Sequence, residues 1–312
     1  MHDRPVTTAV GPWEVLLAPM DCAGEHEGEE RAPQALLAAG LLAAVSAESA
    51  VELDTGIAAP DRDGDTGVIG LGDLQRSSGV LRAAVRASIG AGRRPLVLGG
   101  DCAIVPGVMA GARDAVDAVG LAFLDGHLDA LDGASSATGE AADMDLAILT
   151  GHGPGALDAC LGRRVVIAPE RIAAIGFRAD APADIAMPDG RHVNETALVD
   201  PAVHRFDAQR LRDLGAERTA ARALDALDAD RRPLWLHLDV DVLDQASLPA
   251  VSYPQAGGPD WAQLEALLTA LARGSDLIGA HVTCFNPDLD PEGSHARRIV
   301  GTIHRALGSP TS

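Results

Sequence analysis

The sequence contains no lysine, so all 25 of its Lys-or-Arg positions are arginine. A Schiff-base mechanism and a P-loop nucleotide site both require a lysine, and both are therefore excluded. Aromatic residues make up only 3% of the chain and include a single tyrosine, so the core must be built from smaller aliphatic side chains. No run of 18 apolar residues that would span a membrane as a helix is present.

Positive charge is also scarce, because 45 acidic residues outnumber the 25 arginines and leave a formal net charge of −20. This charge argues against a nucleic-acid partner and against binding to an anionic membrane surface. The N-terminus lacks the basic and apolar regions of a signal peptide. The four cysteines are spread along the chain without close pairing, which favours reduced thiols. We therefore expect a soluble protein of the cytoplasm.

Apolar stretches of strand character alternate with segments of helical pattern along the chain. The expected strands cover residues 13–19, 94–98, 119–124, 171–177, 233–238 and 277–285. The expected helices cover residues 34–45, 73–89, 104–116, 205–229, 260–273 and 294–307, with Asp73 as the N-cap of the second. This alternation predicts an α/β fold with a mostly parallel sheet and helices on both faces. Since no linker divides the chain, we expect a single domain over residues 1–312.

Polar clusters follow four of the expected strands. They are Gly99–Cys102, Asp125–Asp129, Asp239–Asp241 and the pair Asn286 and Pro287. In open α/β sheets, ligands bind at the carboxyl ends of the strands, so we expect these clusters to meet. One alternative is that the acids begin solvent-exposed loops.

The donors in these clusters suit divalent metal ions. In an extended strand, the side chains of Asp125, His127 and Asp129 point the same way. With Asp239 and Asp241 they supply four carboxylates and one imidazole, which favour hard or borderline ions such as Mn²⁺. So many acids at one point repel one another unless cations neutralise them. Two ions could share the carboxylates and deprotonate a bridging water. Cys102 is a further possible ligand.

These motifs resemble those of the ureohydrolase family of arginases and agmatinases. The family's G-G-D-H-S, D-A-H-x-D, D-V-D-x-x-D and E-V-N-P motifs are similar to Gly99–Ala103, Asp125–Asp129, Asp239–Asp244 and Cys284–Pro287. Their order and separations also fit, so the resemblance spans roughly residues 95–300. It implies a three-layer arginase-type fold, two divalent ions of Mn²⁺, and hydrolysis of a guanidino or amidino C–N bond by metal-bound hydroxide.

The resemblance also implies a role for each ligand. Asp125 and Asp239 are expected to bridge the two metals, Cys102 and Asp129 to complete one site, and His127 and Asp241 to complete the other. Asp129 is expected to be catalytic as well as a ligand. The family resemblance further implies a homo-oligomer, a trimer or a hexamer.

The sequence departs from the family pattern at four positions. Cys102 stands in place of a histidine ligand; it could ligate as a thiolate or be only a small buried residue. In Thr138–Met144, which resembles the family's S-G-N-x-H-G-M stretch, Ala142 replaces a proton-shuttling histidine and Glu140 replaces an asparagine that contacts the substrate's α-carboxylate. Cys284 takes the place of the glutamate that pairs with guanidinium. We therefore do not expect a plain arginase.

Three residues are candidates for the missing roles. Glu140 could hold a cationic guanidinium or amine, or could be an ordinary acid at a helix start. His152, in a glycine-rich loop, could replace the proton shuttle or be a simple loop histidine. Tyr253 could contact substrate or pack its own loop. Cys284 is expected to be a substrate-binding residue.

The preferred function is a metallohydrolase that releases urea or a related small product from a guanidino, N-hydroxyguanidino or amidine-type substrate. Formimino or amide hydrolysis is an alternative. A second alternative, from another class, is a non-catalytic homologue that binds ligand and is stabilised by metal.

Overall fold

The computed structural model describes residues 11–116, 118–179, 193–229 and 232–308. Within these residues, eight strands form one sheet in the order β2-β1-β3-β8-β7-β4-β5-β6. Every neighbouring pair of strands is parallel. The strands are β1 (Trp13–Ala18), β2 (Ala50–Glu52), β3 (Arg94–Gly99), β4 (Gly120–Leu124), β5 (Ile172–Ile175), β6 (His204–Phe206), β7 (Pro233–Asp239) and β8 (Asp276–Thr283).

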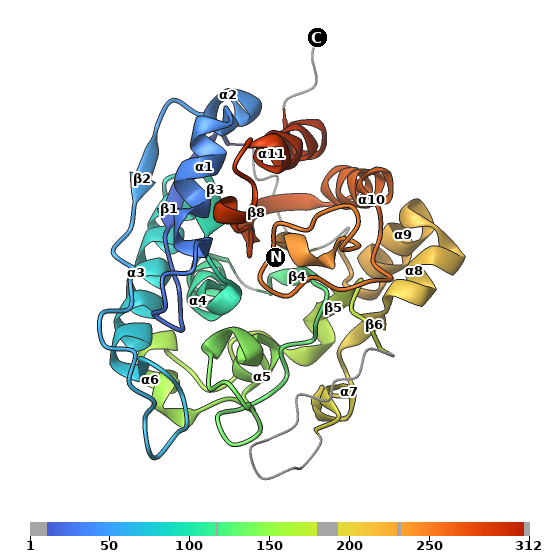
Figure 1. Cartoon of the computed structure of the whole chain (residues 1–312). Coiled ribbons are helices and arrows are strands. Elements are labelled where there is room, and N and C mark those ends of the chain that lie inside the picture. Colours follow the sequence, from blue (N-terminus) through green and yellow to red (C-terminus); the bar gives the residue numbers. More distant parts are fainter. Residues whose placement is uncertain (1–10, 117, 180–192, 230–231, 309–312) are drawn as a thin grey trace, which may run out of the picture.

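Helices cover both faces of this sheet, as Figure 1 shows. They are α1 (Ala32–Ala38), α2 (Leu41–Val45), α3 (Leu71–Gly90), α4 (Val105–Ala115), α5 (Asp145–Thr150), α6 (Asp158–Leu161), α7 (Glu195–Leu198), α8 (Ala208–Leu214), α9 (Ala216–Ala226), α10 (Trp261–Arg273) and α11 (Ser294–Leu307). The predicted three-layer α/β fold with a parallel sheet is confirmed. No helix among the described residues is both long and apolar enough to cross a membrane.

The strands are apolar on both sides because each face of the sheet supports its own core. In β4, Ala122 and Leu124 belong to the cluster beneath α1, α2, α10 and α11. Leu121 and Phe123 belong to the cluster beneath α3, α4 and α5. This alternation follows from the two-residue period of a strand. It also explains why buried parallel strands read as continuous apolar runs in the sequence.

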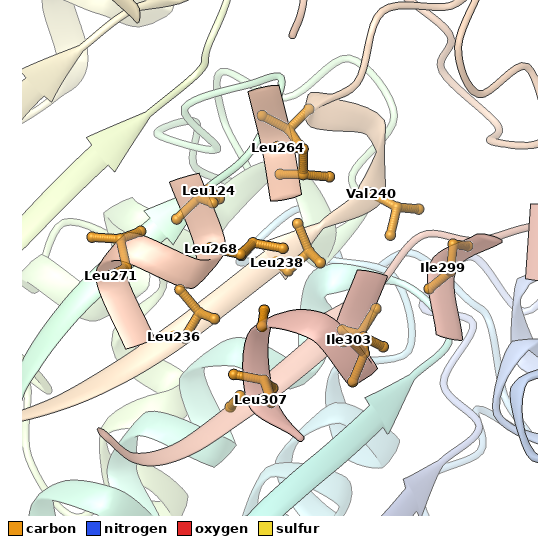
Figure 2. Packing of buried hydrophobic residues seen from close by; sticks show 14 of the residues in the cluster. Leu124, Leu236, Leu238, Val240, Leu264, Leu268, Leu271, Ile299, Ile303 and Leu307 are labelled. Carbon is orange, nitrogen blue, oxygen red and sulfur yellow. The ribbon is translucent and has the colours of Figure 1, made fainter. Parts of the chain in front are cut away.

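The first of these cores shows how helical periodicity matches the sheet. Figure 2 shows leucines of β4 and β7 facing side chains of α10 and α11. The α10 residues Leu264, Leu268 and Leu271 recur every three or four positions, and so lie on one face of their helix. Asp260 caps this helix through a capping box with Gln263, which fixes where α10 begins.

The structure corrects three details of the sequence prediction. Asp73 is not the N-cap of α3, since the helix begins at Leu71; its carboxylate instead accepts hydrogen bonds from the backbone of Ala58 and Ala59. The helix expected at 34–45 is two helices, because Gly40 between them adopts a left-handed conformation with φ of 97°. The helix expected at 205–229 is also divided, and the short strand β6 precedes it.

The topology brings four strand ends together. Strands β3, β8, β7 and β4 are consecutive in the sheet, and each is followed directly by one of the polar clusters. Because all four strands are parallel, these clusters share one edge of the sheet. The prediction that they would meet depends on this order, which the sequence alone does not specify.

A close contact between β7 and β8 generates a stability prediction. A methyl group at Gly279 would overlap the indole ring of Trp235 on the neighbouring strand. Both residues lie inside the sheet, so the ring has no free direction in which to move. We expect Gly279→Ala to lower the free energy of unfolding by about 1–3 kcal/mol, as overpacking in a core usually does.

Urea unfolding followed by circular dichroism measures this effect. Gly79→Ala is the matched control, because Gly79 lies in the middle of α3 with open space around its Cα. This control should raise the free energy of unfolding by about 0.5–1 kcal/mol through helix propensity. Equal unfolding midpoints for Gly279→Ala and the wild type would contradict the packing described for Trp235.

Candidate functional site

The predicted metal ligands converge at the carboxyl ends of the four central strands. The side chains of Asp125, His127 and Asp129 offer ligand atoms that lie within 4.8 Å of one another. Cys102, Asp239 and Cys284 form a second group with the same spacing. The carboxylates are buried, with Asp125 and Asp239 each only 1% exposed. Six residues expected to ligate metal therefore line one pocket: Cys102, Asp125, His127, Asp129, Asp239 and Asp241.

His127 lies between two of these carboxylates. Its Nδ1 is 3.0 Å from Asp241 Oδ2 and 3.6 Å from Asp125 Oδ1. Burial opposes a charge on this ring, but the two carboxylates raise the pKa of His127 well above its usual value. On the other side of the ring, Nε2 lies 2.9 Å from Gln255 Nε2. These contacts on both sides of the ring hold the imidazole of His127 beside the carboxylates of Asp125 and Asp241.

Backbone turns hold the carboxylates of β4 and β7 in place. Asp125 Oδ1 accepts from the N–H of His127 at 2.6 Å. Asp239 caps the 3₁₀ helix Val240–Val242 by accepting from the N–H of Asp241 at 2.8 Å, and it also accepts from the hydroxyl of Thr283 at 3.1 Å. Short polar side chains at strand ends commonly bond to the backbone two residues further on. The D-x-H and D-x-D spacings therefore fix both strand-end turns.

A buried chain of hydrogen bonds leads to Asp125 from behind. Trp235 Nε1 donates to His281 Nδ1 at 2.7 Å, His281 Nε2 lies 2.6 Å from His237 Nδ1, and His237 Nε2 lies 3.3 Å from Asp125 Oδ2. An indole N–H can only donate. Each histidine must then donate from Nε2, and the chain ends as a donor to Asp125. Burial and the neighbouring His237 hold the pKa of His281 well below its usual value, so this ring is neutral.

The charges of the buried carboxylates are unequally stabilised. Burial alone would raise the pKa of Asp125, but hydrogen bonds with His127 and His237 hold it below its usual range. For Asp239, burial and the nearby Asp241 and Asp125 raise the pKa well above its usual value. Burial, Asp125 and Asp145 do the same for Asp129. Without a cation, the site cannot hold all of its carboxylates in the ionised form.

Asp145 shows the deficit of positive charge most clearly. This residue begins α5 and is fully buried, yet neither of its carboxylate oxygens has a hydrogen-bond partner among the described residues. It offers a ligand atom within 4.8 Å of those of Cys102 and Asp129. A buried carboxylate without a donor is costly unless a cation lies close. The donor set and this orphaned carboxylate both fit divalent metal ions.

The pocket above these groups is strongly acidic. Twelve of its lining residues are carboxylates: Asp21, Glu25, Glu27, Glu29, Asp101, Asp125, Asp129, Glu140, Asp143, Glu195, Asp239 and Asp241. His127 is the only basic side chain among the described residues that line it. Several of these acids come from the segment before α1. Such a pocket attracts cations and repels anions.

The predicted substrate-binding residues also line this pocket. Glu140, Tyr253 and Cys284 all do so, as does Ala142 in the place of the family's histidine. Burial, followed by the charges of Asp143 and Asp101, raises the pKa of Glu140 to about 8. Tyr253 is 54% exposed, so it lies at the mouth rather than at the base. The roles expected for these residues remain predictions.

His152 does not join the site. Its side chain is 59% exposed, its Nε2 lies 3.6 Å from Asp200 Oδ2, and it is absent from the described lining of the pocket. Its glycine-rich loop was the reason to expect a close approach, but this loop follows the C-terminus of α5 rather than a strand end. The placement gives no support to a role for His152 as proton shuttle.

Sequence reasoning missed four residues that the structure places at or behind the site. The sequence pattern could have indicated His237 and His281, because each places a polar side chain within an apolar strand, where it requires a buried partner. Asp145 carried a similar signal at the start of the apolar helix α5. Glu29 carried none, since its neighbours read as an ordinary acidic loop; burial raises its pKa to about 7.

Comparison with known proteins agrees with this geometry. The chain is 26% identical over 303 residues to an arginase of Bacillus caldovelox, covering 95% of this chain and 98% of that protein. It is 29% identical over 241 residues to a formimidoylglutamase of Chromobacterium violaceum, covering 76% and 71% of the two chains. The native structure of the Bacillus caldovelox arginase at pH 5.6 superposes with a TM-score of 0.84 at 24% identity, covering 97% of this chain and all of that one.

The chain also matches the description of a protein family. The model of the Arginase family matches residues 12–308, which is nearly the whole chain. The fold, the strand-end motifs and the buried donor groups agree with that match. The chain belongs to the arginase family.

Proposed function

We propose that this protein is a dinuclear-metal hydrolase that cleaves a C–N bond of a cationic guanidino or amidino compound. The observation that carries the proposal is the convergence of six potential ligands at the base of a pocket lined by twelve carboxylates. Asp125, Asp239, Cys102 and Asp129 would hold one ion, and Asp125, Asp239, His127 and Asp241 would hold the other. Two divalent ions bound there would act as Lewis acids and activate water.

The protein's own groups set the orientation of the ligands. Trp235, His281 and His237 hold Asp125 through hydrogen bonds that point towards it. Thr283 does the same for Asp239. Hydrogen-bonded support of this kind fixes a ligand's orientation and its basicity. The buried base of the pocket also excludes bulk water from the reacting bond.

Glu140 is the proposed substrate-binding and proton-transfer group. Ala142 has no side chain that can move a proton, whereas the Glu140 carboxyl lines the same pocket two residues earlier. With a pKa raised to about 8 by burial and neighbouring acids, it can hold a proton near neutral pH and release it when a cation binds. A group with a pKa near the working pH is well suited to general acid–base catalysis.

A formimino compound is the second candidate substrate class. It is also an amidine, and the similarity to a formimidoylglutamase favours it. The acidity of the pocket favours a cationic compound over an anionic one in either class. A non-catalytic, metal-stabilised binding protein is the alternative that assays must exclude. A screen of guanidino and amidino compounds for release of urea or ammonia, with Mn²⁺ and with Zn²⁺, tests the proposal.

The first prediction concerns metal content. Asp125→Ala and Asp239→Ala should each abolish binding of both ions, because each carboxylate is proposed to bridge them. Elemental analysis of the purified proteins measures the stoichiometry. Asp288→Ala is the control, since Asp288 forms a surface ion pair with Arg31 outside the pocket. Two equivalents of metal retained by Asp125→Ala would rule out the two-metal arrangement.

The second prediction concerns L-arginine. The pocket that would receive L-arginine is lined by carboxylates, which repel its α-carboxylate, and the family's guanidinium-binding glutamate and proton-shuttling histidine are replaced by Cys284 and Ala142. Steady-state assays should give a kcat/KM for L-arginine well below about 10⁴ M⁻¹s⁻¹, and below that for agmatine, which lacks the carboxylate. Preference for L-arginine would contradict the proposed specificity.

The third prediction is a dependence on pH that resides in Glu140. The carboxylate form binds a cation and the protonated form does not, so KM for a cationic substrate should fall as pH rises through about 8. Glu140→Gln should remove this dependence and raise KM about 10- to 150-fold, the effect of losing a charge-assisted hydrogen bond. Glu48→Gln, on the exposed surface, is the control. An unchanged pH profile in Glu140→Gln would assign the titration to another group.

A further inference from the structure

Two cysteines from neighbouring strands meet at the base of the pocket. Cys102 follows β3 and begins the 3₁₀ helix Cys102–Ile104, and Cys284 directly follows β8. These strands are paired in the sheet. The two sulfur atoms and a carboxylate oxygen of Asp239 all lie within 4.8 Å of one another. This spacing suits two thiolates on one zinc ion, whose Zn–S bonds of about 2.3 Å place tetrahedral sulfur ligands about 3.8 Å apart.

The backbone at Cys284 has a strained conformation that keeps this residue close to Cys102. Its φ is 66°, in the left-handed region that residues other than glycine rarely adopt. Its N–H donates to the carbonyl of Gly100 at 2.6 Å, so the end of β8 is tied to the turn that precedes Cys102. Strain of this kind persists where the surrounding structure requires it and concentrates at functional sites.

A buried carboxylate next to the cysteines also favours a cation at this position. Asp145 offers a ligand atom within 4.8 Å of the sulfur of Cys102, and both of its buried oxygens lack partners among the described residues. A cation bound at the sulfurs would stabilise this carboxylate as well.

We propose that Cys102 and Cys284 together bind one of the two metal ions as a pair of thiolates, with Asp239 as a third ligand. Each thiol releases its proton to solvent as its sulfur–metal bond forms, and no electrons are transferred. Thiolates favour zinc over manganese, which prefers oxygen ligands. This inference rests on the proposed function and changes one part of it: Cys284 binds metal rather than substrate, and the two metal positions differ in preference.

Titration of the metal-free, reduced protein with Co²⁺ tests the inference without any assay of activity. Thiolate ligands give cobalt a charge-transfer absorption that oxygen and nitrogen ligands do not. We expect this absorption in the wild type, half of it in Cys102→Ser and in Cys284→Ser, and none in the double variant. Cys160→Ser is the control, because Cys160 lies on α6 outside the described lining of the pocket; it should absorb as the wild type does.

The Cys284→Gly variant is a control for a folding defect in Cys284→Ser. Glycine adopts the left-handed conformation without strain, so this variant should fold while lacking the thiol, and it should match Cys284→Ser in absorption. Competition between Zn²⁺ and Mn²⁺ should shift towards Mn²⁺ in both variants. Full charge-transfer absorption in Cys284→Gly would overturn the inference and leave Cys102 as a single thiolate ligand. Failure of the wild type to bind Co²⁺ at all would overturn the proposed function together with the inference.

Discussion

The main constraint on this structure is a concentration of buried carboxyl groups at one edge of a parallel sheet. Asp125, Asp129, Asp145 and Asp239 are all at most 6% exposed, and His127 is the only basic side chain among the described residues lining their pocket. Burial and mutual repulsion raise the pKa values of Asp129, Asp145 and Asp239. Divalent cations provide the compensation that buried carboxylates otherwise lack. Bound divalent cations would account for both the acidic pocket and the orphaned carboxylate of Asp145.

The rest of the fold keeps these groups close. Two apolar cores fix the central strands from both faces, and the hydrogen bonds from Trp235 through His281 and His237 to Asp125 lie inside the sheet itself. Gly279 leaves room for the indole of Trp235, which is the first donor in this series of hydrogen bonds. The packing of β7 against β8 thus supports Asp125 at the end of β4, so the contacts that stabilise the sheet also position this proposed ligand. The family fold is retained, whereas Cys102, Ala142, Glu140 and Cys284 give this pocket its own chemistry.

The sequence predicted six of the eight strands and drew attention to the six proposed ligands, because buried parallel strands read as apolar runs, with polar residues where they end. It could not supply the strand order, which depends on pairing between distant segments, and so could not show that β3, β8, β7 and β4 are neighbours. The short edge strands β2 and β6 are too brief for a periodic signal. Asp145 and Glu29 reach the site through tertiary packing alone. His152 was considered as a proton shuttle because its loop is rich in glycine, but glycine content does not show in which direction a loop points.

Two ions of different metal preference are proposed to bind between Asp125 and Asp239. Anomalous diffraction from crystals grown with Mn²⁺ and Zn²⁺, recorded at both absorption edges, locates and identifies each ion. We expect two peaks about 3.5–4 Å apart, the separation typical of two-metal sites, with zinc at the peak beside Cys102 and Cys284 and manganese at the peak beside His127 and Asp241. A single peak, or peaks away from Asp125 and Asp239, would contradict this proposal.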